Sequence, residues 1–491
     1  MIQKNKPNTK NYQVISLLNA FSRTELDRFS EFISSPYFNK DQWVIKLFEA
    51  LKKLIIDQKP FDNDNQIKVF SLVFSEKIVG SLLNKQEKKL LGVKMSVLTR
   101  LAKRFLINEG LSITPSCEIE LLSKQLLEKK QSHILARILK KHQQILSENK
   151  EKGIEYYVYA FQVELGQMNY LYQNGTLLKE DNFAALIEDL DLLYILNKLK
   201  LQATMLSIAR ATQKEFNFSC IEKITPLLTL YETYPIVILY RSIIQLMTDW
   251  QETTYLNLLS LLEQYHASIP KTYLIDFYYV AANFCARQIL LGNSIYNKNI
   301  FHLYKKMELK DLLLAKGVMP PVKLKNLVVI ACRAQEYDWI TTIIEKYFTF
   351  VKQEIRESVY HYNLGVIDFY KKNYQEAISH FIRVEKINLA YDFDCRLLLL
   401  QAYYQMDTSY DERTMQIFRS AEQFVNNNKM MPFKQKKNYK NFIQILISLY
   451  RVRHKVGKKT LASIKKKMLQ MEVIMAKKWL LEKIDELKVN H

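Results

Sequence analysis

Histidine side chains are the residues of this sequence whose spacing would most readily reveal a metal site. His133 and His142 lie nine residues apart, whereas two ligands on one helical face lie about four apart. His361 and His380 fall in two consecutive predicted helices and could lie near each other. A histidine pair without carboxylate or cysteine ligands at suitable spacing is more often polar filling. We therefore predict no bound metal.

Motifs of the common enzyme classes are missing from the sequence. No glycine-rich phosphate loop, GxGxxG, HExxH, GxSxG or EF-hand pattern occurs. Asp189 and Asp191 are two residues apart, so on a helix their side chains point in different directions. We predict no catalytic residue and no cofactor. A catalytic site assembled from residues far apart in the chain stays open as the last of three functional hypotheses.

The spacing of the cysteines and the length of the apolar runs indicate the cellular compartment. The five cysteines lie at least 47 residues apart, which is too scattered for a disulfide framework or a CxxC zinc pair. No uncharged apolar run approaches the roughly 18 residues that cross a bilayer, and the apolar stretch 14–21 is too short for a signal peptide. We expect buried thiols, no transmembrane segment and a cytoplasmic protein.

The net charge of +21 is concentrated at the two ends of the chain. Residues 1–110 carry a net +8 and residues 429–491 a net +13, whereas residues 111–428 are neutral. The candidate contacts to a polyanion are six lysines beside apolar helix stripes: Lys436, Lys437, Lys440, Lys465, Lys466 and Lys467. They predict weak, sequence-independent binding to nucleic acid or an anionic surface, the second hypothesis. The alternative is a solvated surface, because lysine outnumbers arginine 55 to 16 and arginine grips phosphate better.

The scarcity of turn residues predicts an all-α fold. Ten glycines and ten prolines in 491 residues are too few for the hairpins of a sheet protein. Ser22-Arg23-Thr24-Glu25 fits a capping box that opens a helix, which Pro36 ends. Asp62–Asn65 is typical of a polar turn. The apolar stripe of a later helix is predicted to contain Val93, Val97, Leu98, Leu101 and Phe105, and the helices beyond it to be interrupted at 150–153, 174–175, 226, 235, 270, 292–293 and 320–321.

Three polar-aromatic turns mark an internal repeat. They occupy 336–339, 373–376 and 409–412, which are 37 and 36 residues apart, and each lies between two apolar-periodic helices. Around the middle turn, Leu364-Gly365, Tyr374, Ala377 and Phe381 resemble the tetratricopeptide repeat. The resemblance implies helix pairs that approach closely at small residues. The departures from that repeat are Asp368 for an aromatic residue, Val384 for a small residue and Leu389 for the closing proline.

The whole chain also resembles a family of large helical-repeat proteins of Bacteroidota, through short motifs that occur in the same order along the chain. These motifs are Glu25-Leu26 with Phe29 and Phe32, Ser35–Asn39, Leu190-Asp191 with Lys198-Leu199, Asn283-Phe284-Cys285, Lys325-Asn326, Tyr337-Asp338-Trp339 and Trp479–Ile484. Phe284 stands where that family usually has Tyr, and Leu192-Leu193 replaces its aromatic pair. The resemblance implies an intracellular repeat protein and carries over no catalytic residue.

The leading hypothesis is a non-enzymatic scaffold that binds an unidentified peptide or protein on the concave face of an elongated right-handed α-solenoid. In a tetratricopeptide-like frame, the groove candidates are Tyr362, Val366, Phe369 and Tyr370. The alternative is that a neighbouring helix covers these side chains. The expected organisation is an N-terminal helical domain (1–110), degenerate helical repeats (111–325), tetratricopeptide-like repeats (326–428) and a basic C-terminal helical cap (429–491).

Overall fold

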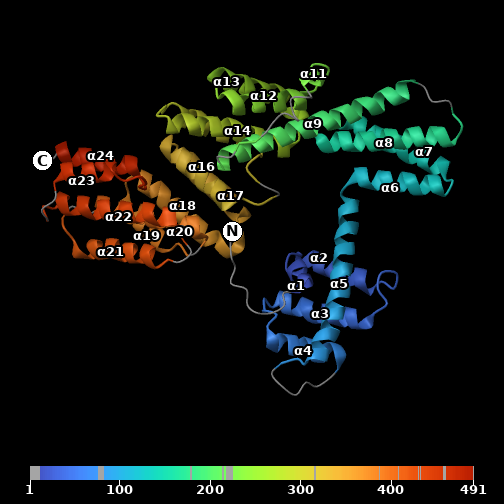
Figure 1. Ribbon diagram of the computed structural model, residues 1–491, viewed down its shortest axis with the longest axis horizontal. Helices are drawn as coiled ribbons and strands as arrows, with labels where there is room; N and C mark the ends of the chain where they lie inside the picture. The colour runs from blue at the N-terminus through green and yellow to red at the C-terminus, as the bar shows by residue number, and fades with distance from the viewer. Residues whose placement is uncertain are drawn as a thin grey trace. The chain divides into compact units, whose positions relative to one another are not determined.

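The computed structural model describes residues 12–75, 82–176, 180–212, 215–216, 225–314, 317–385, 387–406, 409–428, 431, 433–456 and 460–489. These residues form α-helices joined by turns and short 3₁₀ segments, and they contain no β-strand (Figure 1). The prediction of an all-α fold is confirmed. The chain divides into two compact units, 1–194 and 195–491, and α9 passes from the first into the second. The predicted division at 110, 325 and 428 stays a prediction.

The first unit holds the helices up to the start of α9. They are α1 (Gln13–Leu18), α2 (Arg23–Ser34), α3 (Gln42–Ile56), α4 (Asn63–Phe74), α5 (Lys85–Ser112), α6 (Pro115–Glu128), α7 (Ser132–Glu148), α8 (Ile154–Gln173) and α9 (Glu180–Thr212). The helices α1–α5 share one core, in which Phe29 packs edge-on against Phe48 and lies beside Phe105. Val14 and Leu18 are buried in that core, so the apolar stretch near the N-terminus is a core helix.

The local signals in this unit are partly confirmed. Ser22 and Glu25 form the predicted capping box, because each side chain accepts from the other residue's backbone N–H. The prediction of a turn at Asp62–Asn65 is wrong: Asp62 caps α4, and its carboxylate accepts from the Asn65 N–H at 2.9 Å. Asp favours both turns and N-caps. Val93 is wrong as a core residue, because it is 53% exposed and the buried stripe passes through Leu91 instead.

The second unit is a succession of helices that pack on their neighbours in the chain (Figure 1). They are α11 (Thr225–Leu228), α12 (Pro235–Asp249), α13 (Glu252–Tyr265), α14 (Lys271–Leu290), α15 (Tyr296–Leu309), α16 (Pro321–Arg333), α17 (Tyr337–Tyr347), α18 (Arg356–Tyr370), α19 (Tyr374–Ile382), α20 (Leu389–Met406), α21 (Glu412–Asn427), α22 (Phe433–Arg453), α23 (Leu461–Leu469) and α24 (Lys477–Val489). Pro235 and Pro321 lie in the first turn of their helices, where the missing N–H carries no penalty. The turn predicted at 409–412 lies between α20 and α21, whereas Glu336 and Asn373 are N-caps and the residues that follow them form the first turns of α17 and α19.

The pair α18–α19 shows why glycine is required at one position of the repeat. A Cβ on Gly365 would lie 2.7 Å from Cε1 of Phe381, closer than packed atoms approach. Phe381 and Ala377 are buried between the two helices. Gly365 therefore lets α18 and α19 pack closely, as the resemblance to the tetratricopeptide repeat implies.

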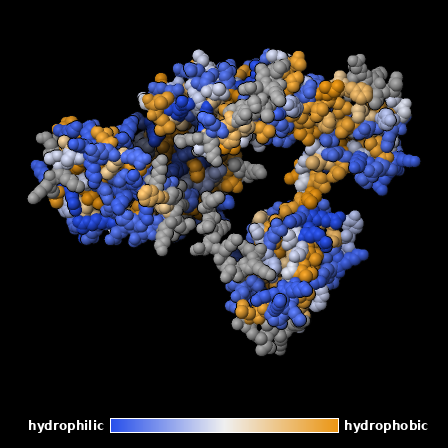
Figure 2. Space-filling model, in the orientation of Figure 1, coloured by the Kyte–Doolittle hydropathy of each residue, from blue (hydrophilic) through white to orange (hydrophobic). Residues whose placement is uncertain are grey.

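The helices α20–α24 share a core at the C-terminal end of the second unit. Tyr439, Phe442, Leu446 and Leu449 form the buried face of α22, as their spacing predicts. The spacing of the apolar residues from Leu461 to Met475 predicts one continuous helical stripe, but α23 ends at Leu469. Hydrophilic side chains cover most of the visible surface over α21–α24 in Figure 2.

Candidate functional site: a groove between α14, α15 and α16

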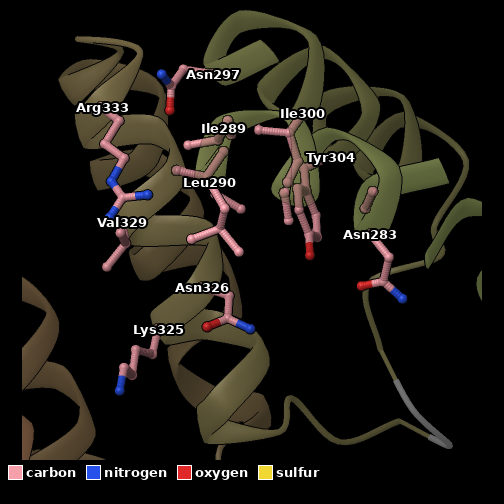
Figure 3. A pocket seen from close by; sticks show the side chains of 13 residues that line it. Asn283, Ile289, Leu290, Asn297, Ile300, Tyr304, Lys325, Asn326, Val329 and Arg333 are labelled. Atoms are coloured by element: carbon pink, nitrogen blue, oxygen red, sulfur yellow. The ribbon is translucent and has the colours of Figure 1, made fainter. Parts of the chain in front are cut away.

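An open apolar groove of about 390 Å³ lies between three helices of the second unit (Figure 3). Its lining residues are Ala282, Asn283, Ala286, Ile289 and Leu290 of α14, Asn297, Ile300 and Tyr304 of α15, and Lys325, Asn326, Val329, Ile330 and Arg333 of α16. Ile300 and Tyr304 are almost fully buried and form its floor. Such a volume is in the range of sites that hold several side chains of a ligand.

The groove exists because α14 and α16 have few direct contacts with each other. The helix α15 packs against both α14 and α16, and α16 packs along α18 on its other side. The space between α14 and α16 therefore stays open above α15. Figure 3 shows Arg333, Val329, Asn326 and Lys325 following one another along α16, with Leu290 and Ile300 across from them. Leu290 is 88% exposed at the end of α14. Its apolar side chain therefore lies in solvent at the rim of the groove.

The polar groups of the groove are amides and cations. Asn283 and Asn326 are exposed, and no hydrogen bond within the described ranges engages their side chains. Arg333 is exposed, and none of the ion pairs of the described residues involves it. Lys325 differs, because Asp394 of α20 pairs with it and burial lowers the pKa of its ammonium. The part of the chain that the structure describes contributes no carboxylate to the groove lining. The groove offers apolar surface, free amides and positive charge, a combination that suits a peptide with an acidic group.

The four residues predicted to line a partner groove on α18 do not belong to the groove between α14, α15 and α16. Tyr362 is 1% exposed and Val366 is buried, and the Tyr362 ring packs edge-on against Tyr391 at 4.7 Å. Phe369 and Tyr370 are half-buried, and the Tyr370 carbonyl accepts from the Tyr337 hydroxyl. Tyr362 and Val366 are thus core residues, because α16 and α20 pack against α18. A binding role for them is corrected to a packing role.

Sequence reasoning missed the groove because its apolar residues have the same helical spacing as core residues. Leu290 and Val329 continue the stripes of α14 and α16 without any change of residue type. The available signal was the pair Asn283 and Asn326, which interrupts those stripes with amides inside the motifs that carry the family resemblance. Packing partners, which spacing does not reveal, decide which stripe stays open.

The six candidate lysines near the C-terminus divide into two groups. Lys437 pairs with Glu472 and Lys465 with Asp485, both at 3.4 Å, and the Lys436 ammonium donates to the Asn426 carbonyl. The second group has no ion pair or hydrogen bond within the described part of the chain and consists of Lys440, Lys466 and Lys467. That second group is the part available to a polyanion.

The predicted proximity of His361 and His380 is confirmed. Their Nδ1 atoms lie 3.0 Å apart, and Asp368 Oδ2 is 3.7 Å from Nε2 of His380. Burial lowers the pKa of His380, which the Asp368 carboxylate partly offsets. Across the residues that the structure describes, no group of three or more His, Cys, Asp or Glu side chains could hold a metal ion. The pair is accounted for by hydrogen bonding between α18 and α19.

One carboxylate in the first unit has an unusual environment that its spacing did not reveal. Burial between α8 and α9, together with the charges of Glu164 and Glu188, raises the pKa of Asp189 to about 7. Lys152 lowers it only in part. Glu164, whose charge helps to raise the pKa of Asp189, lies on α8. The sequence spacing had related Asp189 only to Asp191.

The described cysteines are free thiols, and three of them are buried. Burial raises the pKa of Cys285 to about 11 and those of Cys332 and Cys395 to about 12. These three thiols stay protonated near neutral pH and are poor nucleophiles. Cys117 is exposed, and Cys220 lies outside the described residues.

The comparisons add no relative. No family model, no curated protein and no solved structure matches this chain. Among the described helices, none combines the length and the apolar character that a membrane crossing requires. The functional argument therefore rests on the geometry of the groove.

Proposed function

We propose that this protein is a non-enzymatic scaffold that binds a peptide segment of a partner protein in the groove between α14, α15 and α16. The observation that carries the proposal is an open apolar groove in which, among the described residues, the amides and Arg333 are unpaired and no carboxylate belongs to the lining. Exposed apolar clusters on a folded surface usually mark an interaction site. Leu291 and Ile295, in the turn after α14, add exposed apolar surface close by in the chain.

The groove divides recognition between two kinds of contact. Apolar side chains of a peptide would pack on Leu290, which is exposed, and on Val329, which is partly exposed. This burial would provide most of the affinity. The amides of Asn283 and Asn326 can each donate to and accept from a peptide backbone. Arg333 would bind a carboxylate at the end of α16.

The larger architecture that we propose around this groove is an elongated right-handed solenoid of tetratricopeptide-like helix pairs. It is supported by the packing of successive helices on their chain neighbours and by the close approach at Gly365. Small-angle scattering should give a radius of gyration above the roughly 23 Å expected for one compact domain of this length. The free, buried thiols favour a reducing compartment such as the cytoplasm.

A peptide-display selection tests the binding proposal. The full-length protein is used to select from a library of random 12-residue peptides, and enriched peptides are measured by fluorescence anisotropy against three proteins. These are the wild type, Leu290→Glu and Leu256→Glu. Leu256 is 54% exposed on α13 and does not line the groove, so it is the matched control.

We expect Leu290→Glu to weaken peptide binding at least about tenfold, because it places a charge against an apolar ligand surface. Leu256→Glu should bind like the wild type. Both variants should melt at the wild-type temperature, since both positions are exposed. A selection without enriched peptides, or peptides indifferent to Leu290→Glu, contradicts the proposal.

A second candidate function is weak polyanion binding through the C-terminal lysines. The observation in its favour is that Lys440, Lys466 and Lys467 have no acidic partner among the described residues. No aromatic stacking surface or arginine-rich helix accompanies them, so binding would be electrostatic and would weaken steeply with salt.

A further inference from the structure

Two arginines converge on one tryptophan at the start of the second unit. The Cζ atom of Arg210, near the end of α9, lies 4.0 Å from the ring centroid of Trp250. The Cζ atom of Arg287, on α14, lies 4.8 Å from the same centroid. Both distances are within the range of a cation–π contact. Two guanidinium groups thus contact the same ring.

This arrangement contains hydrogen-bond donors without an acceptor. Neither arginine has an ion pair or a side-chain hydrogen bond within the residues that the structure describes. The Nε1–H of Trp250 is buried and likewise has no acceptor there. The nearest carboxylate along the chain, Asp249, accepts from the Gln251 N–H and the Thr254 hydroxyl. Burial and the charge of Arg287 lower the pKa of Arg210.

The tryptophan is held rigidly in place. Trp250 is the C-cap of α12 and has a left-handed backbone with φ of 52°, a conformation that is unfavourable for a bulky residue. Its ring lies nearly parallel to that of Phe284, with a 7° interplanar angle and 6.2 Å between centroids. Phe284 in turn stacks on Tyr255. Strained backbone at a rigid aromatic surface is common where a protein presents a ligand contact.

One of the two arginines, Arg287, lies next to the groove along α14. Arg287 follows Asn283 by four residues and precedes Leu290 by three, and both of those residues line the groove. Residues three and four apart on a helix are neighbours on its surface. A ligand that contacts Leu290 is therefore within about one helical turn of the Arg287 guanidinium.

We propose that Arg210 and Arg287, held on Trp250, bind the side-chain carboxylate of an Asp or Glu residue in the peptide that occupies the groove; this rests on the proposed peptide-binding function. Arginine pairs with carboxylates through two parallel hydrogen bonds. The apolar groove beside the arginines favours a peptide over nucleic acid, which needs an extended basic surface. Residues 111–428, which contain both arginines, have no net charge, so the positive charge here is local.

The test uses the full chain labelled with 5-fluorotryptophan and reads its ¹⁹F NMR spectrum. The sequence contains four tryptophans, and Trp250→Phe assigns the resonance of Trp250. The probe is acetyl-Glu-Glu-Glu-amide at low ionic strength, and acetyl-Gln-Gln-Gln-amide is the neutral control. The proteins are the wild type, the double variant Arg210→Gln/Arg287→Gln and the single variant Arg241→Gln. Arg241, on α12, pairs with Glu232 and controls for the loss of an arginine elsewhere.

We expect the glutamate peptide to shift the Trp250 resonance saturably, with half-saturation on the order of 1 mM, and the glutamine peptide to leave it unchanged. The double variant should lose at least about tenfold in affinity, while Arg241→Gln should keep the shift. The resonances of Trp43, Trp339 and Trp479 should stay in place in the double variant, which shows that it is folded.

The outcomes separate this inference from the proposed function. No shift in the wild type, or a shift that survives in the double variant, overturns the arginine assignment, while peptide binding that depends on Leu290 would still stand. Display peptides indifferent to Leu290→Glu overturn the groove proposal and, with it, the placement of the carboxylate in a groove-bound peptide. A single-stranded RNA hexamer that shifts Trp250 at a concentration at least tenfold lower than the glutamate peptide would replace the carboxylate with a phosphate.

Discussion

The pair α18–α19 and the groove between α14 and α16 show two outcomes of the same helical pattern. On α18, Tyr362 and Val366 are covered by neighbouring helices, and Gly365 allows Phe381 to pack against the helix backbone. On α14 and α16, apolar residues of the same kind, such as Leu290 and Val329, border open space. The tetratricopeptide-like repeat is easiest to recognise in the sequence where its two helices pack closely. The candidate site lies where two helices leave a groove between them.

The difference follows from which helices meet. The helix α16 packs along α18, whereas α14 and α16 have few contacts among the described residues and α15 packs against both. Closed packing fixes side chains and excludes a partner. Where two helices leave a groove between them, apolar surface stays exposed to water. Exposed apolar surface of this kind usually marks an interaction site. The contrast between the closely packed α18–α19 pair and the groove can be tested by substituting residues in each of them.

The largest expected effect comes from removing a ring in the closed pair. Tyr362→Ala should lower the free energy of unfolding by about 3–5 kcal/mol, because a buried aromatic side chain leaves a cavity. Leu290→Ala, in the open groove, should change it by less than about 0.5 kcal/mol. Urea denaturation followed by circular dichroism measures both. Similar losses at both positions would mean that the groove is also packed core.

A smaller loss is expected when an atom is added at the closest approach. Gly365→Ala should destabilise by about 1–3 kcal/mol, because its Cβ would meet the Phe381 ring at 2.7 Å. Gly110→Ala is the control, since a Cβ there meets nothing within 4 Å on helix α5. That change should stabilise by about 0.5–1 kcal/mol, because alanine favours the helix. A stabilising Gly365→Ala would show that α18 and α19 are not in close contact.

The first unit offers a titratable test of closed packing. Asp189, with a pKa raised to about 7, holds its proton in the folded state while the unfolded chain releases it near pH 4. Stability is therefore lost as the pH rises from about 4 to about 7. Asp189→Asn should stabilise by about 1–2 kcal/mol at pH 8 and change little at pH 4. Asp191→Asn is the comparison variant. An equal effect of Asp189→Asn at both pH values would rule out the raised pKa.

How far the sequence predicts this molecule depends on whether a feature is local. The capping box at Ser22 and the positions where paired helices meet, near 336, 373 and 411, depend on residues close in the chain, and they were predicted correctly. Val93 as a core residue, and Tyr362 and Val366 as groove residues, were wrong, because exposure is set by helices distant in sequence. The convergence of Arg210 and Arg287 on Trp250 joins residues 77 apart, and no spacing rule finds it.

The smallest expected effect concerns the C-terminal lysines, whose surface is exposed like that of the groove but charged. Changing Lys440, Lys466 and Lys467 to Gln should weaken binding to single-stranded RNA at about 50 mM salt by several-fold and lower the salt slope. Changing Lys436, Lys437 and Lys465 should do less, because these lysines already have partners. Both effects should nearly vanish at about 150 mM salt. Sequence-selective binding that persists there would instead make nucleic acid the principal partner.

Site-specific photocrosslinking tests most directly the central claim, that the groove between α14, α15 and α16 is the peptide-binding surface. p-Benzoylphenylalanine replaces either Asn326, in the groove, or Leu256, on α13, and a peptide from the display selection is added. The account predicts a covalent peptide adduct from position 326, mapped by mass spectrometry and competed by unlabelled peptide, and none from position 256. Crosslinking from position 256 with none from position 326 would contradict it.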